Sequence, residues 1–141
     1  MNLLPESELK ALNRSGEYPA FAYIMKVTTM DGYTWTKIGK TKYTPYERAR
    51  GIKRDGRKKG NVKYYSVDPI YYIPCKSDSD AELMENVLRA CLTLIDPRKF
   101  MPHDTFGAFN DDFVTYLITH PDVRRNAKEF GVAKWVAENV I

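Results

Sequence analysis

The chain of 141 residues contains only two cysteines and two histidines, and this scarcity excludes several classes of small protein. Cys75 and Cys91 lie 16 positions apart, so they form neither a CxxC pair nor the framework of a disulfide-rich domain. His103 and His120 are isolated in the sequence, with no second histidine or cysteine at zinc-finger spacing. We therefore expect reduced structural thiols and no structural zinc.

Long hydrophobic runs are also missing. No apolar stretch approaches the roughly 20 residues that cross a bilayer. The first residues, MNLLPESELKAL, lack the basic start and the continuous apolar segment of a signal peptide. With 43% hydrophobic and 28% charged residues, the composition is typical of a soluble globular protein. We expect one cytoplasmic domain with a small appendage and no membrane association.

Basic charge is concentrated in one segment. Residues 37–63 contain eleven lysines and arginines against two acidic residues, a net charge of +9 in a chain whose total is +4. Such a segment is typical of a face that binds a polyanion, although RDGRKKGN alone would also suit a solvated loop. The candidate nucleic-acid contacts are Lys40, Lys42, Arg50, Lys53, Arg54, Arg57, Lys58 and Lys59.

The first half of the chain has the pattern of a helix, a β-hairpin and a second helix. Residues 5–14 suit a short helix, and FAYIMKVTT with YTWTKI on either side of Asp31-Gly32 predicts a hairpin. A Thr44-Pro45-Tyr46-Glu47 capping box predicts a helix that ends at Gly56. Residues 64–75 then suit an edge strand that Pro69 interrupts.

The second half is predicted to be helical. A second capping box, from Ser79 to Glu82, would open a helix that ends before Pro97. Three shorter helical pieces follow from residue 110. We predict an α/β (α+β) fold: a small three-stranded, mainly antiparallel sheet flanked by helices in residues 1–109, and a helical C-terminal extension in residues 110–141. The last two pieces also have helix-turn-helix spacing, but Trp135 would then be exposed, which favours a helical hairpin packed on the core.

The order of strand, strand and basic helix carries three short motifs. Tyr23 lies on the first strand, Lys37-Ile38-Gly39 ends the second, and Arg48 follows on the helix. Over roughly residues 20–100 this order and spacing resembles the core of the GIY-YIG nucleases, in particular a phage and bacterial branch whose second motif reads Lys-Ile-Gly-Lys-Thr. The resemblance implies hydrolysis of a phosphodiester in DNA, most naturally double-stranded, with Mg²⁺ or Mn²⁺.

The resemblance also implies roles for individual residues. Tyr23 would position or deprotonate the attacking water, and Arg48 would bind the scissile phosphate. Lys37 takes the place of the family's second tyrosine. A lysine is a poor base unless it is desolvated, but as a nearby cation it would lower the pKa of Tyr23.

The metal ligand in this family is a glutamate on the helix after the third strand, where Glu82 and Glu85 are both available. Glu82 has a structural explanation as the partner of Ser79 in the capping box. Glu85 lies beside the helix's apolar stripe, where a carboxylate has no evident structural purpose. We therefore predict Glu85 as the ligand.

Each residue also has a purely structural interpretation. Tyr23 suits a core strand, Lys37 and its neighbours suit a solvated hairpin, and Arg48 suits an exposed helix face. Two further functions stay open: a catalytically weak nucleic-acid-binding module on the same fold, and a protein-interaction or inhibitor factor that keeps only the scaffold.

The charge distribution generates a test. Replacing Arg57, Lys58 and Lys59 with glutamine should flatten the dependence of log K on log salt for DNA binding by up to about 3, near one unit for each lost phosphate contact. Fluorescence anisotropy at several salt concentrations would measure it. An unchanged slope would show that this segment is merely solvated.

Overall fold

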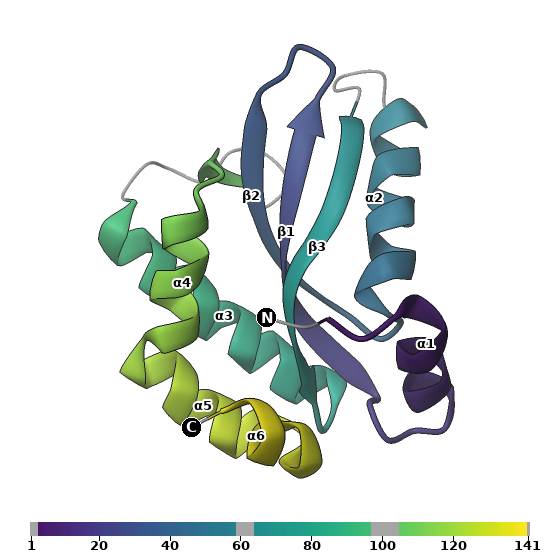
Figure 1. The fold of residues 1–141 in the computed structure, drawn as a ribbon, viewed down its shortest axis with the longest axis vertical. Coiled ribbons are helices and arrows are strands. Elements are labelled where there is room, and N and C mark those ends of the chain that lie inside the picture. Colours follow the sequence, from purple (N-terminus) through teal and green to yellow (C-terminus); the bar gives the residue numbers. More distant parts are fainter. Residues whose placement is uncertain (1–2, 59–63, 97–104, 141) are drawn as a thin grey trace.

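The computed structural model describes residues 3–58, 64–96 and 105–140, and within these residues helices cover a twisted antiparallel sheet (Figure 1). The strands lie in the order β3-β1-β2-β4. The α+β class is confirmed. In chain order the elements are α1 (Glu6–Arg14), β1 (Ala20–Thr29), β2 (Thr34–Thr41), α2 (Pro45–Lys58), β3 (Tyr64–Cys75), α3 (Asp78–Ile95), β4 (Thr105–Ala108), α4 (Asp111–Thr119), α5 (Pro121–Phe130) and α6 (Ala133–Asn139).

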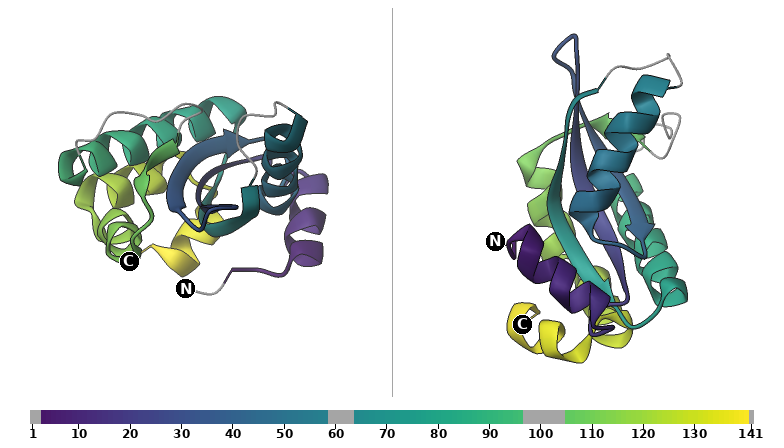
Figure 2. Two further views of the ribbon diagram at one scale, coloured as in Figure 1. Left: turned by 90° about the horizontal axis from the view of Figure 1, so that it is seen from above. Right: turned by 90° about the vertical axis from the view of Figure 1, so that its right-hand side faces the viewer.

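The β1–β2 hairpin has the predicted turn. Gly32 has a φ of +88°, a conformation that glycine adopts without steric cost. From this turn the two strands pair without a register shift, so that Tyr23 lies opposite Gly39 and Met25 lies opposite Lys37. Because side chains alternate between the faces of a sheet, Tyr23, Lys37 and Gly39 share one face. The hairpin turn lies at the opposite end of the molecule from α5 and α6 (Figures 1 and 2).

The third strand is an edge strand with an irregularity beside its proline, as predicted. Ile24 pairs with Tyr71 and Met25 with Pro69, so Ile70 has no partner of its own. Proline has no amide proton to give to a ladder, which explains why it sits on an outer strand next to a register shift.

The fourth strand was not expected. β4 is only four residues long and pairs with Trp35, Thr36 and Lys37 of β2. A segment this short has no periodicity from which a strand could be inferred. It covers only the first half of the outer edge of β2. Further along that edge, the guanidinium of Arg89 on α3 donates to the carbonyl of Ile38 at 3.4 Å.

The helices have different neighbours. α2 packs on β3 and β1, whereas α3 packs across all three long strands and also contacts α4 and α5 (Figure 2). The C-terminal helices share the main core: Leu117, Val123 and Trp135 are buried, and Trp135 packs against Tyr71 with ring centroids 6.2 Å apart. This burial agrees with the helical-hairpin interpretation. Among the described residues, no helix combines the length and apolarity that a membrane crossing requires.

Helix boundaries show one success and two corrections. The Thr44–Glu47 capping box is present, but α2 continues through Gly56 to Lys58 instead of ending at Gly56. The predicted Ser79–Glu82 box is wrong. The hydroxyl of Ser77 caps α3 by accepting from the amide of Asp80 at 3.1 Å, so Ser79 lies inside the helix. Two serines two positions apart both offered a cap, and the earlier one begins the helix two residues sooner, with Asp78 and Asp80 in its first turn.

The first capping box makes stability depend on pH. Burial alone would raise the pKa of Glu47, but hydrogen bonds from Thr44 and Arg14 outweigh it and lower the pKa below the usual 4.5. A lowered folded-state pKa contributes stability at pH values above the unfolded pKa, and this contribution is lost as the pH falls through the folded value.

Glu47→Gln should therefore lower the free energy of unfolding by on the order of 1 kcal/mol at neutral pH. The difference from wild type should shrink as the pH falls below about 4.5. Urea denaturation across pH would measure it, with the exposed Glu17→Gln as the matched control. A constant difference at every pH would contradict the ionic origin of the effect.

Candidate functional site

Near the end of β2, the β1–β2 pair contains a tyrosine packed on a glycine. Tyr23 is 2% exposed, and a Cβ placed on Gly39 would lie 2.4 Å from its hydroxyl oxygen. No side chain fits there, so residue 39 has to be glycine while Tyr23 keeps this position. The two motifs that are separate in the sequence therefore form one contact in the fold.

Lys37 lies on the same face, two residue pairs along the hairpin from Tyr23. Its side chain is buried, with 8% of the residue exposed. Burying an ammonium group costs free energy unless it is paired, so packing does not explain a lysine at this position. The interpretation of Lys37 as a solvated hairpin charge is wrong.

Glu85 is buried on α3, whereas Glu82 is exposed. The carboxylate of Glu85 pairs with Arg89 one helical turn later, at 2.9 Å between Oε1 and Nη2. The same guanidinium group reaches the Ile38 carbonyl, so this ion pair ties α3 to the second motif strand. The predicted position of Glu85 beside the apolar stripe, among Met84 and Leu88, is confirmed.

Lys40 is engaged by the start of α3. Its ammonium lies 2.8 Å from Oδ2 of Asp78, and this hydrogen bond is the main cause of its raised pKa. The nearby charges of Glu82 and Glu85 raise it further. Lys40 alternates with Gly39 along β2, so it lies on the opposite sheet face from Tyr23. In this arrangement Lys40 binds a carboxylate of the same chain.

The remaining predicted cations lie on or near α2. Arg48 is exposed and forms no ion pair among the described residues, and Arg50 is paired with Glu6 at 2.5 Å, which raises its pKa. Lys42 and Arg54 are exposed and Lys53 is partly exposed. The side chains of Arg57 and Lys58 and the whole of Lys59 lie outside the described residues. α2 packs on β3 and β1 and α3 packs across all three long strands, so Arg48 and Glu85 come to the sheet on separate helices.

One cluster has no signal in the sequence. Cys91 of α3 meets His120 and Asp122 at the corner between α4 and α5, with potential ligand atoms all within 4.8 Å of one another. In the sequence, Cys91 lies 29 positions before His120, and only the packing of α5 on α3 brings it to the other two residues. Burial, with a contribution from Asp122, raises the pKa of the Cys91 thiol.

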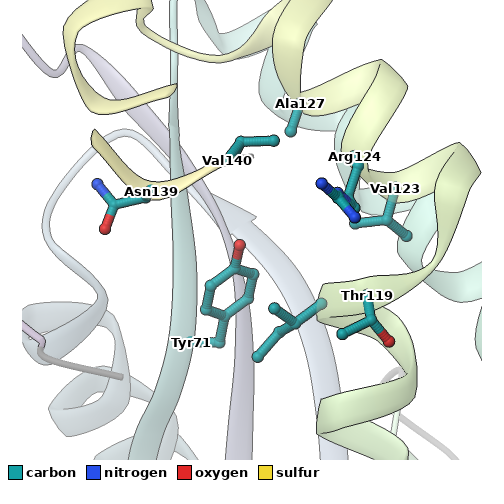
Figure 3. Close-up of a pocket in the computed structure, with 8 residues that line it drawn as sticks. Tyr71, Thr119, Val123, Arg124, Ala127, Asn139 and Val140 are labelled. Carbon is teal, nitrogen blue, oxygen red and sulfur yellow. The ribbon is translucent and has the colours of Figure 1, made fainter. Parts of the chain in front are cut away.

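A separate cavity of about 180 Å³ lies between Tyr71 and the C-terminal helices (Figure 3). The Tyr71 hydroxyl points into it, and burial raises the pKa of this phenol to about 12. Thr119 of α4, Arg124 of α5 and Asn139 of α6 contribute further polar groups to its lining. None of the predicted catalytic residues lines this cavity.

No family model, curated protein or solved structure matches the chain. The nuclease resemblance therefore depends on this chain alone: on the order of its motifs and on the contacts that their side chains make.

The Tyr23–Gly39 contact can be tested with two glycine substitutions. Gly39→Ala should lower the free energy of unfolding by roughly 1–3 kcal/mol, because the added methyl group overlaps the Tyr23 ring. Gly51→Ala on α2 is the matched control. Its methyl group would lie 3.7 Å from the nearest atom, and it should stabilise the helix by up to about 1 kcal/mol. Thermal melts of both variants would decide, and a wild-type melting temperature for Gly39→Ala would refute the contact.

Proposed function

We propose that the protein is a metal-dependent endonuclease of the GIY-YIG type that acts on double-stranded DNA in the cytoplasm. The observation that carries this proposal is the placement of buried polar groups along the second motif strand, β2. Tyr23 packs on Gly39, Lys37 lies beside them on the same face, and Glu85 is tied to the same strand through Arg89. Buried ionisable groups that packing does not require are typical of functional sites.

The residues suit a hard divalent cation. Mg²⁺ binds through one or two carboxylates and keeps several waters, and Glu85 offers one buried carboxylate. Such an ion, when bound, would stabilise negative charge on the phosphate and lower the pKa of a bound water. Glu85 would hold the ion in place of its ion pair with Arg89.

The protein groups have distinct roles in this proposal. The Tyr23 phenol orients or deprotonates the attacking water. Its usual pKa near 10 has to fall for that purpose, and the Lys37 ammonium on the same face favours the phenolate. Arg48 presents an exposed guanidinium group, in no ion pair with another described residue, that can bind the scissile phosphate in a bidentate manner.

The Glu85–Arg89 ion pair also favours a second candidate, a nucleic-acid-binding module with weak or no catalysis. If the pair persists on DNA, Glu85 holds no metal and the exposed cations of α2 supply affinity only. Both candidates predict salt-sensitive DNA binding. Only the nuclease predicts cleavage that depends on metal and on Glu85.

Nicking of supercoiled plasmid with Mg²⁺ or Mn²⁺ separates the two. Glu85→Gln should lower cleavage at least about a hundredfold, because loss of a charge-stabilising group at the reacting phosphate costs roughly 3 kcal/mol or more. Glu82→Gln, three positions earlier on the same helix and exposed, is the matched control and should cleave normally. Calorimetry should show that Glu85→Gln loses the heat of Mg²⁺ or Mn²⁺ binding, whereas Glu82→Gln keeps it.

Removing Glu85 leaves Arg89 without this partner, which also destabilises the fold. Activity is therefore compared per folded molecule, well below each melting temperature. Full cleavage by Glu85→Gln, or no metal-dependent cleavage by wild type, would sink the nuclease proposal and leave the binding module.

A further inference from the structure

The Cys91, His120 and Asp122 side chains converge on one point outside the candidate nuclease site. The Cys91 sulfur lies 3.7 Å from Nδ1 of His120, and Oδ2 of Asp122 lies 4.0 Å from the same nitrogen. Cys91 is 4% exposed, His120 is largely buried and Asp122 reaches the surface. A thiol, an imidazole and a carboxylate are the three commonest kinds of zinc ligand in proteins.

The geometry does not suit a nucleophilic cysteine. In a thiol-imidazole-carboxylate relay, the thiol contacts one ring nitrogen and the carboxylate orients the imidazole from the other. Here both partners approach Nδ1. Burial also raises the pKa of the Cys91 thiol, whereas an activated nucleophile needs a lowered pKa.

Convergence on a single nitrogen is what a shared metal ion requires. The ligand atoms of a tetrahedral zinc site lie about 3.3 to 3.6 Å apart, as its bond lengths dictate. The observed separations need only a small inward movement of the side chains. Arg125 pairs with Oδ1 of Asp122, so the other carboxylate oxygen, Oδ2, is the one that faces the cluster. The Tyr116 ring packs edge-on against the His120 imidazole.

One existing interaction competes with a metal. The backbone amide of Asp122 donates to Nδ1 of His120 at 3.0 Å and caps the start of α5. A metal at Nδ1 replaces this hydrogen bond. The exchange is favourable, because one cap hydrogen bond amounts to about a tenth of the binding free energy that is typical of structural zinc.

We propose that Cys91, His120 and Asp122 bind a transition-metal ion of the Zn²⁺ class, which ties α3 to the α4–α5 corner. The mixed sulfur, nitrogen and oxygen set selects such an ion over Mg²⁺ or Ca²⁺, which prefer oxygen ligands alone. Three protein ligands leave a fourth position for water or an added ligand. The exposure of Asp122 places that position toward solvent.

Cobalt is the probe for this site, because Co²⁺ substitutes for Zn²⁺ and shows a thiolate-to-metal charge-transfer absorption when a cysteine binds it. The full chain, freed of metal with a chelator, should bind one equivalent of Co²⁺ with this absorption, and Zn²⁺ should displace it. Zn²⁺ alone should raise the melting temperature. Asp122→Asn should weaken the affinity by roughly one to two orders of magnitude, since even groups behind the ligands contribute that much.

Two matched variants make the test specific. Cys75→Ser removes the other buried thiol, which is not part of the cluster, and should keep the absorption. Cys91→Ser should abolish it. His120→Asn should weaken binding while asparagine still caps α5. Circular dichroism checks that each variant is folded. Absence of the charge-transfer absorption in wild type, or its persistence in Cys91→Ser, would overturn the proposal. Glu85→Gln should leave the cobalt spectrum unchanged, so this site and the proposed nuclease metal site fail independently.

Discussion

The register between β1 and β2 is the constraint on which the candidate nuclease site depends. A tyrosine hydroxyl occupies the space where residue 39 would carry a Cβ atom, so only a glycine opposite Tyr23 allows the strands to pair in this way. A slip by one residue would place Ile38 or Lys40 opposite Tyr23. It would also move Lys37 to the other face of the sheet. The glycine therefore fixes both the pairing and the side on which the buried ammonium lies.

Along β2, the structure contains polar groups where an apolar core would be simpler. Lys37 is buried within the sheet, and the Glu85–Arg89 ion pair lies against β2 at the boundary of the core. Buried ion pairs are often no more stabilising than apolar residues of similar volume. Departures from the simplest packing tend to mark functional positions, which is why we place the proposed chemistry here. By contrast, Lys40 and Arg50 are paired on the surface with acidic residues of the same chain, so a count of basic residues overstates the charge available to DNA.

Much of the fold follows from local signals in the sequence. The Asp31-Gly32 turn, the capping box at Thr44 and the proline of β3 each act over a few residues, and all three appear where expected. The errors have equally local reasons. Ser77 and Ser79 offered competing caps, Gly56 lies inside a helix that continues past it, and β4 is too short to have a pattern.

The candidate site likewise contains residues whose positions local signals predicted and residues whose positions they did not. Helical spacing distinguished the buried Glu85 from the exposed Glu82, although the capping argument used alongside it was wrong. From the sequence, Lys37 was compatible with a surface charge. Whether a strand residue is buried depends on which other elements pack over that strand, and the local pattern does not show this. The cluster at Cys91 could not be foreseen, since its members meet only through the packing of α5 on α3.

The end of β3 is joined to the C-terminal helices by backbone as well as by side chains. Val132 donates to the carbonyl of Pro74, and Lys76 donates to the carbonyl of Phe130. Trp135 covers Tyr71 from the same side. A fragment that stops at residue 109 would thus expose the part of the motif-bearing sheet around Tyr71 to water and leave the Pro74 carbonyl and the Lys76 amide without these partners. The nuclease-like segment of this chain is not a portable module, and any fusion or transplant of it has to carry the last three helices along.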